Sequence, residues 1–73
     1  MAQIEIGSPV TGTVWKVECA VGDTVKEGDI IMILESMKME IPVEASADGV
    51  IKSLNVEPGN SVEDDQVLCV VES

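Results

Sequence analysis

Apolar and polar positions alternate along most of this 73-residue chain, in short runs that are separated by turn residues. Alternation with a period of two is typical of half-buried strands. Two runs of five apolar residues interrupt it, and their length, branched side chains and flanking turns favour buried strands over helices. No stretch has the period of an amphipathic helix. The pattern therefore predicts an all-β fold without helices, with strands at 2–6, 12–17, 30–34, 41–45, 49–55 and 67–71.

The two halves of the chain repeat each other at a constant spacing of 37 residues, so that 8–36 matches 45–73 without gaps. Gly12 matches Gly49 and Gly22 matches Gly59, and the apolar positions also correspond. Such repetition indicates two copies of one supersecondary unit, neither long enough to close a core alone. We therefore expect residues 1–73 to form a single domain. It should be a flattened barrel or sandwich of two antiparallel four-stranded sheets, related by a pseudo-two-fold axis.

The repeat also predicts the backbone of the turns. Gly59 follows Pro58 and suits the second central position of a type II turn, where φ must be positive. Gly22 should share this conformation because it is the equivalent residue. In a second pair of matched turns Asp65 replaces Gly28, and aspartate tolerates the left-handed region better than most residues. When the repeat is continued to the chain ends, Met1 is the equivalent of Lys38. The two termini should therefore lie together at the pole opposite Lys38.

The reversal at Ser36-Met37-Lys38-Met39 departs from the other turns. Tight hairpins normally use Asn-Gly, Asp-Gly or a glycine where φ is positive, and this segment has none of these. A local violation of turn chemistry is where functional constraint is expected. Two methionines exposed at a hairpin tip suit adaptable recognition by a partner. The alternative is an ordinary surface lysine whose neighbouring methionines fold back onto the end of the barrel.

Charge and composition exclude several classes of function. Fourteen acidic residues against four lysines give a net charge of −10, which repels phosphate backbones and anionic lipid headgroups. We therefore expect neither nucleic-acid binding nor membrane binding. No apolar run approaches the roughly 20 residues of a membrane span, and no signal-peptide pattern opens the chain. These features predict a cytoplasmic protein.

The repeat also predicts the environment of Cys19, Cys69 and Trp15. Cys19 stands where the second half has Val56, and Cys69 stands where the first half has Met32, so both are expected to be small buried hydrophobes. Two thiols without histidine supply no zinc site by themselves. Trp15 alternates with core positions and is expected on the outer face. There it either packs flat over its neighbours or contacts a partner.

The stretch Glu35-Ser36-Met37-Lys38-Met39-Glu40, at the join of the two half-domains, resembles the attachment site of biotinyl carrier domains of biotin-dependent carboxylases. The resemblance covers the whole chain, including the matched strands and glycines around 12–14, 21–25, 28–29 and 47–51. The chain is most similar to the small free-standing biotin/lipoyl attachment proteins. The resemblance implies the barrel-sandwich hybrid fold of that family.

The resemblance also implies a function and a set of partners. Lys38 would be acylated by biotin through its ε-amine, and Met37 and Met39 would be read by the biotin protein ligase with help from Glu35. The attached biotin would then carry carboxylate from a biotin carboxylase to a carboxyltransferase. A chain without histidine or arginine is poorly equipped for general acid–base catalysis or anion clamping, so we expect a carrier rather than an enzyme.

The sequence leaves two other functions open. A lipoyl carrier domain shares the architecture, but its lysine typically lies in an Asp-Lys-Ala context rather than Met-Lys-Met, and one domain could accept both groups. An unmodified barrel domain acting as an adaptor is the other alternative. The mass of the purified chain distinguishes all three.

Overall fold

Short strands account for the fold of residues 2–73, which are the residues that the computed structural model describes. This part of the chain has no helix long and apolar enough to cross a membrane. The strands are β1 (Gln3–Gly7), β2 (Gly12–Val17), β3 (Thr24–Val25), β4 (Ile30–Ser36), β5 (Met39–Glu44), β6 (Gly49–Leu54), β7 (Ser61–Val62) and β8 (Val67–Glu72). The predicted all-β class is confirmed. All six predicted strands are present, whereas β3 and β7 were not predicted.

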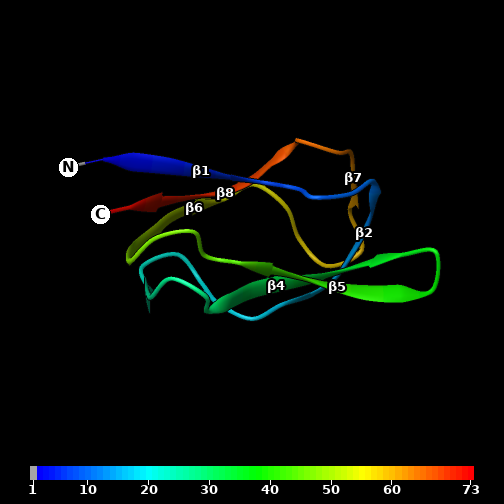
Figure 1. Cartoon of the computed structure of the whole chain (residues 1–73), viewed down its shortest axis with the longest axis horizontal. Helices are drawn as coiled ribbons and strands as arrows, with labels where there is room; N and C mark the ends of the chain where they lie inside the picture. Colours follow the sequence, from blue (N-terminus) through cyan, green and yellow to red (C-terminus); the bar gives the residue numbers. More distant parts are fainter. Residues whose placement is uncertain (1) are drawn as a thin grey trace.

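Two antiparallel four-stranded sheets lie face to face (Figure 1). One sheet has the order β1-β8-β6-β3 and the other has the order β5-β4-β2-β7. A step of 37 residues converts β1 into β5, β2 into β6, β3 into β7 and β4 into β8. The two sheets therefore have the same strand order, and the predicted pseudo-two-fold arrangement is confirmed.

The irregularities of the sheets follow the same repeat. Trp15 is the extra residue of a bulge in β2, and its equivalent Lys52 is the extra residue in β6. Ile31 in β4 and its equivalent Leu68 in β8 form a second matched pair of bulges. A bulge redirects a side chain relative to the strict alternation of a strand. Ile31 and Leu68 are consequently buried next to buried neighbours, which explains the apolar runs of the sequence.

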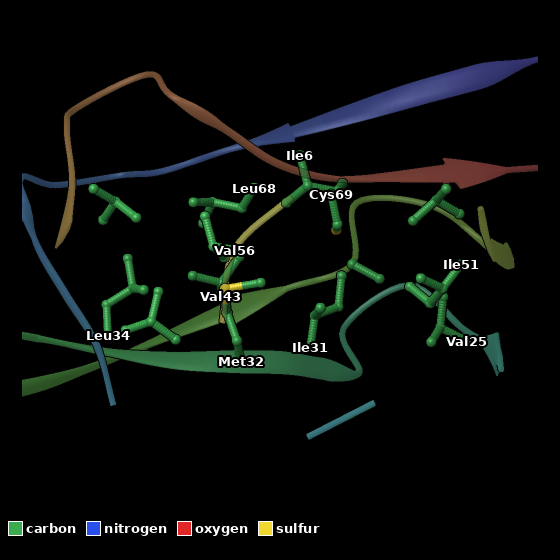
Figure 2. Close-up of a cluster of buried hydrophobic side chains, with 14 residues drawn as sticks. Ile6, Val25, Ile31, Met32, Leu34, Val43, Ile51, Val56, Leu68 and Cys69 are labelled. Atoms are coloured by element: carbon green, nitrogen blue, oxygen red, sulfur yellow. The ribbon is translucent and has the colours of Figure 1, made fainter. Parts of the chain in front are cut away.

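Side chains from both sheets meet in one core (Figure 2). Its fully buried apolar members are Val14, Ile31, Met32, Leu34, Ile51, Val62, Leu68, Cys69 and Val71. Burial of branched aliphatic groups, at about 25 cal/mol per Å² of apolar surface, supplies the main stabilising term. Each half contributes the same positions, so neither half has a closed core without the other.

The burial expected from the repeat is confirmed for Cys69, whereas Cys19 is buried only in part. Cys69 is fully buried, like Met32, and Cys19 is half-buried with its thiol 3.5 Å from the carbonyl oxygen of Ile31. Burial raises the pKa of Cys69 to about 11, so its thiol is neutral at physiological pH. Both thiols are free. Within residues 2–73 no group of three potential metal ligands comes together.

The predicted left-handed turn residues are confirmed. Gly22 and Gly59 have φ of 97° and 93°, and Gly28 and its equivalent Asp65 have φ of 93° and 67°. Hydrogen bonds of 3.0 Å close the first pair of turns, from the Asp23 amide to the Ala20 carbonyl and from the Asn60 amide to the Glu57 carbonyl. The matched geometry shows that the repeat preserves backbone conformation even where the side chain changes.

Gly59→Val is expected to lower the free energy of unfolding by at least ~1 kcal/mol, because a branched side chain disfavours positive φ. No atom lies within 4 Å of a Cβ built at Gly59, so the cost comes from the backbone rather than from a clash. Urea unfolding followed by circular dichroism measures it. Gly22→Val should behave alike, whereas Asp65→Gly should not destabilise. A Gly59→Val variant with the wild-type midpoint would contradict this assignment of strain.

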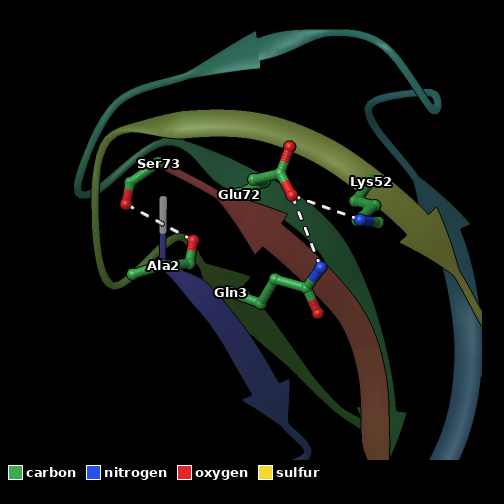
Figure 3. A network of polar contacts seen from close by, with 5 residues as sticks. All are labelled: Ala2, Gln3, Lys52, Glu72 and Ser73. Atoms are coloured by element: carbon green, nitrogen blue, oxygen red, sulfur yellow. Dashed lines mark hydrogen bonds and ion pairs between the residues drawn. The ribbon is translucent and has the colours of Figure 1, made fainter.

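The chain ends lie together at one pole, and the β4–β5 hairpin lies at the other (Figure 1). The Ser73 amide donates a 2.9 Å hydrogen bond to the Ala2 carbonyl, beside a weaker bond from the Ser73 hydroxyl (Figure 3). The domain is 36 Å long and 18 Å across. The prediction for the C-terminus is therefore confirmed, while Met1 itself lies outside the described residues and Ala2 marks the N-terminal end.

Candidate functional site

The β4–β5 hairpin ends in a two-residue turn formed by Met37 and Lys38. Ser36 and Met39 are the last cross-strand pair of the ladder. Met37 and Lys38 have φ of 52° and 68°, so both occupy the left-handed region. Type I′ turns require positive φ at both central residues, which is why Asn-Gly is preferred there. Met37 and Lys38 each cost about 1 kcal/mol or more in this conformation.

The side chains of the tip point into solvent. Met37 is 92% exposed and Met39 is 61% exposed, and Lys38 is exposed between them. The alternative in which these methionines fold back onto the barrel is therefore wrong for Met37. Glu35 is also exposed, one residue before Ser36 on β4. All four residues singled out in the sequence as a candidate site thus lie together at one end of the domain.

Two contacts below the tip hold the hairpin in place. The Ser36 hydroxyl donates a 2.9 Å hydrogen bond to the Thr11 carbonyl oxygen. Gly12 passes so close to β4 that a Cβ built on it would lie 2.5 Å from the Glu35 carbonyl oxygen. Sequence reasoning did not identify Ser36, Thr11 or Gly12 as supports of the site. The repeated glycine at positions 12 and 49 was the signal that could have indicated a close approach.

The tip projects into solvent, with Met37 92% and Met39 61% exposed. Two open hollows of about 420 and 460 Å³ occur elsewhere, one between β1 and β5 and the other beside Cys19. Neither is lined by Met37, Lys38 or Met39. Side chains this exposed are poorly suited to retain a free small molecule, because ligand pockets bury most of their ligand. An exposed primary amine on a rigid hairpin is instead suited to carry a covalently attached group. Lys38 therefore fits the role of acyl acceptor for the carboxyl group of biotin.

Replacement of Met37-Lys38 by Asn-Gly is expected to raise the free energy of unfolding by about 1–2 kcal/mol, because asparagine and glycine both tolerate positive φ. Urea unfolding of the double variant against the wild type measures the change. Ser36→Ala is the matched control below the turn. It should have the opposite effect, about 1 kcal/mol of destabilisation, through loss of the hydroxyl bond to Thr11. An Asn-Gly variant that is no more stable than wild type would show that the tip is not strained.

Several relatives match this chain over most of its length. A biotin/lipoyl attachment protein of Bacillus subtilis is 41% identical over 81% of this chain and 81% of its own length. The alpha3 subunit of a biotin-dependent acyl-coenzyme A carboxylase of Mycobacterium leprae is 46% identical over 90% of this chain. That match spans only 11% of the subunit. The chain is thus similar both to a small attachment protein and to one part of a large carboxylase subunit.

A solved structure and a family model agree with these matches. The crystal structure of the urea carboxylase of Kluyveromyces lactis superposes on 99% of this chain with a TM-score of 0.93 and 33% identity. The superposed part is 6% of that chain. The family model described as biotin-requiring enzyme matches residues 3–71, which include both sheets and the hairpin tip. The chain therefore belongs to the family of biotin-requiring enzymes, which confirms the resemblance noted in its sequence.

Proposed function

We propose that this chain is a biotin carboxyl carrier, in which biotin is joined by an amide bond to the ε-amine of Lys38. The observation that carries the proposal is the exposed lysine between Met37 and Met39, held on a strained turn in a domain of the biotin-requiring family. Backbone strain that is maintained at an exposed tip is expected where a function depends on the residues that bear it.

Attachment requires a second protein, because the tip is exposed and the chain has no histidine or arginine with which to activate biotin. A biotin protein ligase activates the carboxyl group of biotin and presents it to the carrier. The free amine of Lys38 attacks that carbonyl carbon, the N–C bond forms, the C–O bond to the leaving group breaks, and the amine proton passes to water. Met37 and Met39 offer polarizable side chains to the ligase, and Glu35 adds a charge below the turn.

The attached group supplies a ureido nitrogen that holds a carboxyl group between a biotin carboxylase and a carboxyltransferase. The chain itself contributes a rigid barrel and a flexible lysine arm. Tethering raises the effective concentration of the attached group at both enzymes. The net charge of −10 favours encounter with basic surfaces on these partners. We place this activity in the cytoplasm and assign the bond-making steps to the partner enzymes.

Intact mass of the chain, purified from cells that express its own ligases, tests the proposal. We expect one added biotinyl group, located on Lys38 by peptide mapping. The same sample should then accept labelled bicarbonate carbon when incubated with a biotin carboxylase and ATP. A lipoyl adduct would instead assign the chain to lipoyl carriers, and an unmodified mass would favour an adaptor role. Either result would reject the biotin carrier.

A further inference from the structure

The internal repeat provides a reference for the surface beside the hairpin. Glu72 on β8 is the equivalent of Glu35 on β4. The Glu72 carboxylate accepts hydrogen bonds from Lys52 Nζ at 3.2 Å and from Gln3 Nε2 at 3.4 Å (Figure 3). These two donors, Lys52 first, hold the pKa of Glu72 below its usual range. On this face the carboxylate is thus satisfied by a cation within the same chain.

The hairpin face lacks that cation. The equivalent of Gln3 is Glu40, which pairs directly with Glu35 across β4 and β5. Two like charges directly opposite each other destabilise a sheet. Within residues 2–73 the ion pairs join Lys16 to Glu18 and Lys52 to Glu72, so neither neutralises Glu35 or Glu40.

Trp15 takes the place of Lys52 on this face. Both are the extra residues of matched bulges, in β2 and β6, so the backbone directs them to equivalent positions diagonal to Glu35 and Glu72. Trp15 is 50% exposed, so part of its indole surface is available to a partner on this face. The hairpin half therefore combines an indole and two exposed carboxylates where the other half has a completed ion pair.

This combination is complementary to an arginine. A guanidinium donates to carboxylates in a planar fork and stacks over an indole ring at the same time. A lysine ammonium lacks the planar stacking surface. The Glu35–Glu40 pair is the next pair after Ser36–Met39, which closes the turn, so a side chain bound here would also approach the tip.

We propose that Trp15, Glu35 and Glu40 form a docking surface, the hairpin patch, that receives an arginine side chain of the biotin protein ligase. The proposal rests on the proposed function, because it assumes that a ligase acts on Lys38. In the complex, the ligase arginine would pair with Glu35 and Glu40. This pairing corresponds to the ion pair that Lys52 and Glu72 make within the chain. Docking there would orient Lys38 toward the ligase.

Steady-state biotinylation by the purified ligase, with biotin and ATP, tests the hairpin patch. Trp15→Lys introduces a cation at the position equivalent to Lys52, where it can neutralise the carboxylates of the patch. KM for the carrier should therefore rise about tenfold while kcat stays unchanged. Glu40→Gln should raise KM several-fold and reduce its dependence on salt. Trp15→Phe keeps an aromatic face and should retain most of the wild-type KM. Lys52→Trp makes the matched exchange on the opposite face and should leave KM unchanged. Thermal unfolding checks that each variant is folded.

The outcomes separate this inference from the proposed function. A wild-type chain that the ligase does not label would reject the carrier itself. If the wild type is labelled, then wild-type KM values for folded Trp15→Lys and Glu40→Gln would overturn the hairpin patch. An equal rise in KM for Lys52→Trp would also overturn it, because the effect would then not be specific to the hairpin face. A loss confined to later carboxyl transfer would assign the surface to another partner and reject the ligase.

Discussion

Lys38→Arg is expected to abolish biotin labelling while changing the free energy of unfolding by less than about 0.5 kcal/mol. Arginine keeps the positive charge at the exposed tip, but its guanidinium does not replace the primary amine as an acyl acceptor. Incubation with ligase, biotin and ATP, followed by intact mass and streptavidin blotting, measures the loss. Urea unfolding of the same sample shows whether the fold persists.

The other three lysines provide the matched controls. Lys16 and Lys52 lie on β2 and β6, and Lys26 is the first residue of the turn that contains Gly28. Arginine at each of these positions should leave labelling at the wild-type level. Labelling of Lys38→Arg at that level would show that the acceptor lies elsewhere and that the hairpin tip serves another purpose.

Gly49→Ala is expected to remove a large part of the net stability of the domain and to lower its melting temperature markedly. A Cβ at Gly49 would lie 2.5 Å from the Glu72 carbonyl oxygen and 2.8 Å from Val71 Cγ1, inside the contact between β6 and β8. Strain of this kind costs roughly 1–3 kcal/mol or more when backbone must move. A domain of this size has only ~3–5 kcal/mol of net stability to lose. Circular dichroism during thermal unfolding measures the effect.

Gly12→Ala is the equivalent change in the other half and should be comparably destabilising, with an added loss of biotin labelling. The methyl group would meet the Glu35 carbonyl oxygen directly below the hairpin tip. Gly7→Ala is the control, since its nearest neighbour would be 3.6 Å away, an ordinary contact. If Gly12→Ala and Gly49→Ala melt together with Gly7→Ala, the close approach of these strands is not required for stability.

The strands and turns were predictable because the same sequence pattern occurs in both halves of the chain. Gly22 and Gly59 carry the same turn signal, and a feature present in both halves is unlikely to arise by chance. Thr24–Val25 and Ser61–Val62 were missed, because strands of two residues are too short for periodicity to register. Their existence depends on hydrogen bonds to β6 and β2, which the fold supplies.

The site was predictable in part. Lys38, Glu35, Met37 and Met39 were singled out from a broken turn rule and a resemblance, and the structure brings them together at the tip. The positive φ of Met37 was not predicted, because its propensity opposes that conformation and the closing pair of the ladder imposes it.

The hairpin patch was beyond sequence reasoning for another reason. Trp15 was expected on the outer face, and its exposure confirms that. Its relation to Glu35 depends on a bulge, and the Glu35–Glu40 pair depends on the register of β4 and β5. A shift of one residue in register would move these side chains to opposite faces. Such relations are properties of the sheet rather than of any short stretch of sequence.

The chain ends have one more implication, for protein engineering. Ser73 and Ala2 are the equivalents of Ser36 and Met39, and they remain hydrogen-bonded although no turn joins them. They are the two sides of a second hairpin whose turn is open. A circular permutant that joins them through a Met-Lys turn, and is cut in the exposed turn at Gly59, would present one acceptor lysine at each pole. The same fold would then become a two-armed carrier.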